Sequence, residues 1–66
     1  MVGKIYKKIN NKYGYIIDSD GNLYLFSTLD ILDDTKIEEG ISVEFKPKKD
    51  LILRATYISR IETSDT

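Results

Sequence analysis

The 66-residue sequence contains no cysteine and no histidine, and these two absences exclude several kinds of protein. Without cysteine there is no disulfide bond, and a zinc site would lack the thiolate and imidazole ligands that zinc prefers. The absence of histidine removes the most common general base, so a hydroxyl nucleophile would have no histidine to activate it. We therefore expect no enzyme activity, no metal site and no cofactor, and a fold stabilised by packing alone.

Long apolar runs are also missing. No segment approaches the roughly 20 apolar residues that a membrane-spanning helix needs. Lys4, Lys7 and Lys8 interrupt any signal-peptide core at the N-terminus. We expect a soluble, cytoplasmic, monomeric protein. Residues 1–66 should form one domain that buries only about 60% of its unfolded surface, with a frayed polar tail over residues 62–66.

Charge is unevenly distributed along the chain, although the net charge is only −1. Residues 1–17 contain four lysines and no acid, residues 18–44 contain eight acids and one lysine, and residues 45–66 contain five bases and three acids. The acidic balance argues against a strong nonspecific binder of duplex DNA, which needs many phosphate contacts. A local basic patch remains compatible with a binder that relies mainly on base stacking.

Two short segments alternate with the period of two that is typical of strands. In the first segment Tyr13 and Tyr15 share a face, and in the second Tyr24 and Phe26 share a face. A turn over residues 18–22 would join the segments into a hairpin. We expect this hairpin to place its aliphatic side chains in the core and to gather all four rings on one exposed surface.

The remaining pattern predicts an all-β fold, a small five-stranded antiparallel barrel, because closure removes the exposed edges of a small sheet. Ile5 and Ile9 fit the core phase of the first strand, and we expect a bulge near Lys7 or Lys8 because Lys7 also falls in that phase. We expect a second bend or bulge within the last strand. Other segments predict a short 3₁₀ turn at residues 27–30, an acidic loop at residues 30–39 and a hairpin loop at residues 47–50. The expected strands are residues 2–9, 13–18, 23–26, 41–45 and 51–61. The expected core contains Ile5, Ile16, Leu23, Leu25, Val43 and Ile58.

The sequence resembles the cold-shock domain family, whose fold is the five-stranded OB barrel. The similarity covers about residues 2–60 and rests on several short motifs in the family's order, although the family's exposed tryptophan and its motif histidine are absent. The resemblance implies single-stranded nucleic-acid binding and a role as an RNA chaperone. The matching segments are Gly3-Lys4-Ile5, Tyr13-Gly14-Tyr15-Ile16, Leu23-Tyr24-Leu25-Phe26-Ser27, Ile37-Glu38-Glu39-Gly40, Val43-Glu44-Phe45 and Ala55-Thr56-Tyr57-Ile58.

We therefore predict a protein that binds single-stranded RNA or DNA with little sequence selectivity, through stacked bases and lysine–phosphate contacts. The alternative is a protein-interaction module, since OB barrels serve many partners. Positive potential over the aromatic face would favour nucleic acid, and negative potential a basic protein. The acidic loop lacks the spacing of a calcium site, since Asp33 and Asp34 are adjacent. The predicted nucleic-acid-binding residues are Lys4, Tyr6, Lys7, Lys12, Tyr13, Tyr15, Tyr24, Phe26 and Arg54, and Lys46, Lys48 and Lys49 are candidates for an opposite phosphate rim.

Overall fold

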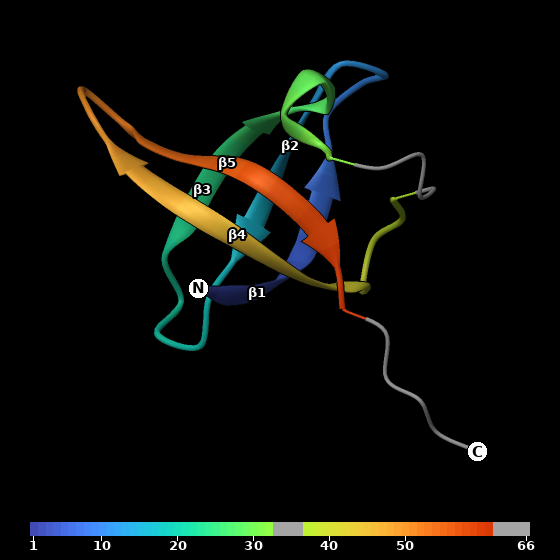
Figure 1. The fold of residues 1–66 in the computed structure, drawn as a ribbon, viewed down its shortest axis with the longest axis horizontal. Coiled ribbons are helices and arrows are strands. Elements are labelled where there is room, and N and C mark those ends of the chain that lie inside the picture. The colour runs from blue at the N-terminus through green and yellow to red at the C-terminus, as the bar shows by residue number, and fades with distance from the viewer. Residues whose placement is uncertain (33–36, 62–66) are drawn as a thin grey trace.

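A computed structural model of the chain describes residues 1–32 and 37–61. These residues form a closed barrel with strand order β1-β2-β3-β5-β4 (Figure 1). No helix in the described part is long and apolar enough to cross a membrane. The elements are β1 (Val2–Lys8), β2 (Tyr13–Ile17), β3 (Leu23–Ser27), the 3₁₀ helix η1 (Thr28–Asp30), β4 (Ser42–Lys49) and β5 (Leu53–Arg60).

The barrel confirms the predicted OB-type architecture, with one difference in strand pairing. Four neighbouring pairs are antiparallel, and β1 closes the barrel by pairing with both β2 and β4. The fifth pair, β3 with β5, is parallel and meets at Leu25 and Arg54. The predicted 3₁₀ turn is confirmed as η1, where Ser27 Oγ accepts a hydrogen bond from the Leu29 N–H at 3.2 Å.

The fourth strand is longer than the sequence pattern suggested. Pro47 and Lys48 lie within β4 and pair with Ala55 and Arg54 of β5, so the prediction of a loop over residues 47–50 is wrong. Pairing of β4 with β1 stops at Glu44, so the segment around Pro47 has a strand neighbour on one side only. A sheet tolerates proline at such an edge. The β4–β5 hairpin consequently extends beyond the barrel wall (Figure 1).

The core confirms four of the six predicted positions and overturns the expected orientation of β3. Ile5, Ile16, Val43 and Ile58 are fully buried, together with Phe45 and Ala55. On β3, however, Tyr24 and Phe26 are only 4% and 2% exposed, whereas Leu23 is 40% exposed and Leu25 is half-buried. The prediction that both rings are exposed and both leucines buried is therefore wrong. The core phase expected for Ile9 is also wrong, since Ile9 is exposed.

Gly14 explains why a ring rather than a leucine faces the core. Gly14 points inward and pairs with Phe26, and a Cβ atom at position 14 would lie 2.7 Å from Cζ of Phe26. The missing side chain thus leaves space that the Phe26 ring fills. Tyr24, opposite Ile16, packs against Phe45 with ring centroids 5.0 Å apart. Together with Phe45, the two rings of β3 supply apolar contact area inside the small barrel that leucines would not match.

Both predicted irregularities are present as β-bulges. In β1 the register shifts between Ile5 and Lys7, which leaves Tyr6 without a partner on β2. In β5 the register shifts opposite Glu44 and Lys46, and Tyr57 adopts a left-handed conformation with φ of 51°. That conformation costs an L-residue roughly 1–2 kcal/mol. Asp33, Asp34 and the predicted frayed tail, residues 62–66, lie outside the described residues.

Candidate functional site

Five side chains on five neighbouring strands lie side by side on the outer surface of the barrel. Directly paired residues of adjacent strands point to the same face of a sheet. The strand pairings connect one such set around the barrel, which we call the cross-strand row. From β1 to β4 the row consists of Lys7, Tyr15, Leu25, Arg54 and Lys48.

The chemistry of the cross-strand row changes from its ends to its middle. Lys7 and Lys48 are exposed at the two ends, and Tyr15, Leu25 and Arg54 are half-buried between them. The row therefore presents one flat ring and one aliphatic side chain between cations and contains no acid. It includes three predicted site residues, Lys7, Tyr15 and Arg54, and one predicted rim residue, Lys48.

Tyr13 extends this surface along β2 toward η1. It pairs with Ser27 of β3 and is 45% exposed. A hollow of about 380 Å³ beside it is lined by Tyr13, Lys12, Ser27, Thr28 and Leu29. The turn that carries Lys12 is held by two hydrogen bonds to Asn10 Oδ1, from the Lys12 N–H at 2.7 Å and the Tyr13 N–H at 2.9 Å. Lys12 and Tyr13 therefore stand together on a defined backbone.

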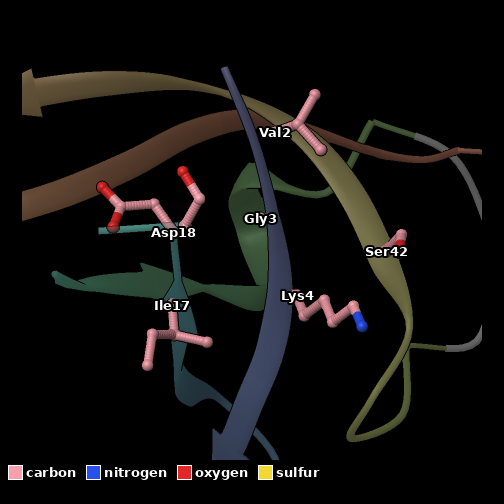
Figure 2. Close-up of a pocket in the computed structure, with 7 residues that line it drawn as sticks. Val2, Gly3, Lys4, Ile17, Asp18 and Ser42 are labelled. Carbon is pink, nitrogen blue, oxygen red and sulfur yellow. The ribbon is translucent and has the colours of Figure 1, made fainter. Parts of the chain in front are cut away.

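Lys4 lies on the same outer face but at its margin. It pairs with Ile17, one step along the strands from the cross-strand row. Figure 2 shows its side chain extending from β1 toward Ser42 of β4, away from Asp18. Lys4 and Ser42 both line a hollow of about 230 Å³ between β1, β2 and β4. Lys4 can thus contact a ligand that crosses β1 at this margin of the outer face.

The remaining predicted rings divide into one that is accessible and two that are not. Tyr6 is exposed at the bulge in β1. Tyr24 and Phe26 are in the core, so neither can offer a ring face to a base. The exposed aromatic surface therefore contains Tyr13 and Tyr15 on β2, with Tyr6 beside them on the neighbouring strand.

A signal for this correction was present in the sequence. Gly14 and Ile16 occupy the inward phase of β2, and a glycine in that phase calls for a large side chain opposite it. Counting the hairpin register from the turn would have placed Phe26 opposite Gly14. The outward orientation of Leu23 and Leu25 follows from the same register.

Asp18 anchors the hairpin that presents this surface. Asp18 is 7% exposed, and its carboxylate accepts hydrogen bonds from the Tyr24 hydroxyl at 2.9 Å and from the Asp20 and Asn22 N–H groups, each at 2.9 Å. Burial alone would raise its pKa, but the hydrogen bonds from Asn22, Tyr24 and Asp20 outweigh that effect and lower the pKa below its usual value of 3.8. Burial, followed by the hydrogen bond to Asp18, raises the pKa of Tyr24 above 10.0.

The arrangement can bind flat, anionic molecules. Among the described residues there is no group of three or more acids placed to hold a metal ion. The groups on the outer face are aromatic rings, aliphatic side chains and ammonium or guanidinium cations. Rings can stack on planar groups, and cations can pair with phosphates.

Comparison with solved structures identifies the fold. The chain is similar to a Drosophila Unr structure that contains the cold-shock domains CSD456, with a TM-score of 0.75 and 18% sequence identity. The match covers 98% of this chain but only 28% of that one. No protein-family model and no curated protein matches the sequence. The predicted cold-shock fold, an OB-type barrel, is thereby confirmed.

Proposed function

We propose that this protein binds single-stranded RNA or DNA across the outer face of β1, β2 and β3, with little sequence selectivity. The observation that carries the proposal is the cross-strand row, in which Tyr15 and Leu25 lie between Lys7 on one side and Arg54 and Lys48 on the other. Bases would stack on the ring and the adjacent aliphatic surface while the cations meet the phosphates. The likeness in fold to the cold-shock domains of Unr supports this assignment.

The number of exposed rings sets the expected strength of binding. Stacking of one base on an aromatic side chain contributes roughly 1–3 kcal/mol. Tyr13 and Tyr15 are available on β2, where the sequence pattern had suggested four rings on the hairpin. We therefore expect reversible binding that is weaker than a four-ring surface would provide.

Stacking also explains why we expect the protein to prefer single strands over duplexes. Every unpaired base has a π-face, so a stacking surface tolerates most sequences. A duplex hides those faces, and it should bind much more weakly. A protein that holds the unpaired form shifts a hairpin equilibrium by mass action without consuming ATP. We accordingly propose that it acts as a monomeric RNA chaperone in the cytoplasm.

The charge of the outer face favours nucleic acid over the alternative partner, a basic protein. The cross-strand row contains three cations and no acid. Lys12, beside Tyr13, adds a fourth cation to the same surface. An aromatic surface that binds a basic protein would be expected to carry acids at these positions.

Tyrosine fluorescence tests the proposal directly, because the protein contains five tyrosines and no tryptophan. A short pyrimidine strand added at low salt should quench the emission saturably, and a duplex of the same length should have little effect. Absence of any binding to single strands at low salt would overturn the proposal and favour the protein-interaction alternative.

A further inference from the structure

Tyr57 is placed where a tyrosine is not needed for the fold. It occupies the left-handed position of the β5 bulge, and among the described non-glycine residues it alone has a positive φ. The ring is 63% exposed, whereas the next residue, Ile58, and Ala55, two residues earlier, are buried. Asparagine or glycine would adopt this conformation with less strain. A strained position that carries an exposed ring suggests a binding role for the ring.

A hollow of about 340 Å³ lies beside this ring. It is lined by Tyr57, Thr56, Lys48, Leu29, Leu32 and Asp30. Leu29 and Leu32 are both exposed, so the hollow has apolar walls that the core does not use.

The walls of this hollow are fixed to one another. The Leu32 N–H donates to the Ile58 carbonyl at 2.8 Å, which ties the segment after η1 to the residue that follows Tyr57. The Thr56 hydroxyl donates to the Lys46 carbonyl at 3.0 Å and joins β5 to β4. The hollow is therefore a preformed feature between η1, β4 and β5.

The charges around the ring suit a phosphate. Lys46 Nζ lies 5.9 Å from the centre of the Tyr57 ring. Lys48 lines the hollow, and its strand partner Arg54 belongs to the cross-strand row. Asp30 is the acid on the opposite wall, on η1. A nucleotide could place its base against Tyr57 and the leucines while its phosphate faces the lysines of β4.

This hollow is continuous with the surface already described. Leu29, which is 92% exposed, lines both this hollow and the one beside Tyr13. Lys48 also ends the cross-strand row. A single strand bound on Tyr13 and Tyr15 can therefore continue over Leu29 toward Tyr57.

We propose that the hollow beside Tyr57 is a second nucleotide site, which takes a base and phosphate of the same strand that binds to β2. The inference rests on the proposed function and extends it: the strand path crosses η1 and ends on the β4–β5 hairpin. Short strands fill the β2 surface alone, and longer strands reach Tyr57.

Binding of oligothymidylates of increasing length tests this site, with Tyr57→Asn as the central variant. Asparagine removes the ring and suits the left-handed backbone, so the variant should melt no earlier than the parent. Strands too short to reach past Leu29 should bind the parent and the variant equally. Longer strands should bind the variant about 5- to 150-fold more weakly, as expected for one stacked base. Tyr57→Phe should retain the parent affinity.

Leu51→Asn is the matched control, because Leu51 is an exposed apolar residue at the tip of the β4–β5 hairpin. Its affinities should equal those of the parent at every length. If Tyr57→Asn binds long strands as the parent does, the proposal of a second site is wrong, whereas the proposed binding surface on β2 is unaffected. If it loses short and long strands equally, Tyr57 belongs to the first site and the second site is again wrong. If the parent binds no strand of any length, the proposed function itself fails.

Discussion

Tyr15 and Tyr24 have similar surroundings in the sequence but opposite positions in the barrel. Tyr15 lies on the outer face between Lys7 and Leu25, whereas Tyr24 lies in the core against Phe45. Substitution of each ring should therefore affect a different property of the protein.

For Tyr15, the expected loss is in binding. Tyr15→Ala should weaken the affinity for a short single strand by about 1–3 kcal/mol, because one stacking face is removed. Tyr15→Phe keeps the π-face and should bind nearly as the parent does. Fluorescence or anisotropy titration measures both affinities, and thermal melting verifies that each variant is folded. Unchanged affinity in Tyr15→Ala would exclude this ring from the binding surface.

For Phe26, the expected loss is in stability. Phe26→Ala should lower the free energy of unfolding by about 3–5 kcal/mol, because it leaves a cavity next to Gly14 that the barrel cannot fill. Urea denaturation measures this change. Leu23→Ala on the same strand is the control and should cost much less, since Leu23 is already partly exposed. Similar costs for the two substitutions would contradict the observed orientation of β3.

Strands β1, β5 and β4 supply the cations that flank the rings, and the strand register determines which cations share a ligand. Lys7, Arg54 and Lys48 lie in the cross-strand row. Arg60 is six residues beyond Arg54, about 20 Å along an extended strand. The cations of the cross-strand row can therefore contact phosphates of the bound strand, whereas Arg60 lies too far along β5 to do so.

The dependence of binding on salt separates these cations. Each phosphate contact with a single strand contributes a slope of about −0.7 to a log–log plot of affinity against salt concentration. Lys7→Gln and Lys12→Gln should each flatten the slope by about that amount, because one fewer counterion is released. Tyr15→Ala should lower affinity at constant slope.

The control for this series is Arg60→Gln, which removes an exposed cation at the far end of β5. It should leave the slope unchanged. A slope that changes equally in Arg60→Gln and Lys7→Gln would show that net charge, and not contact with phosphate, controls binding.

At the scale of the whole molecule, stability should depend on pH through Asp18. Its folded pKa lies below the usual 3.8, so its contribution to stability is present above pH 3.8 and is lost as the pH falls through the folded pKa. Asp18→Asn removes a carboxylate oxygen that accepts the Tyr24 hydroxyl, so this variant should be less stable than the parent at neutral pH. The difference should narrow on acidification below about pH 3.8. Urea denaturation curves recorded at intervals of about one pH unit between about pH 2 and pH 7 measure this difference in the free energy of unfolding.

A difference in stability between the parent and Asp18→Asn that stays constant across this pH range would contradict the role of Asp18. The same titration with Asp20→Asn serves as a control. Asp20 is an exposed neighbour in the turn that donates its N–H to Asp18. Its substitution leaves that N–H in place, so the acid transition should resemble that of the parent.

The sequence by itself determined the class of fold, the approximate strands and much of the candidate surface. Period-two alternation depends on neighbouring residues only, and it located β1, β2, β3 and the buried phase of β2. Tyr13 and Tyr15 were identified in the same way, whereas Lys7 and Lys12 were identified from the acid-free, lysine-rich composition of residues 1–17. These features are local, because a strand presents alternate residues to opposite faces wherever it lies.

Pairing with β2, rather than the pattern of β3 by itself, decided which face of β3 is inside, and only the tertiary structure decided which distant residues share a surface. Alternation in β3 offers leucines on one face and rings on the other, and both faces are apolar, so the pattern alone does not choose between them. The choice follows from the space at Gly14 and from the carboxylate that Asp18 offers to the Tyr24 hydroxyl. Likewise, the cross-strand row exists because barrel closure brings β5 beside β3, a contact between residues far apart in the chain.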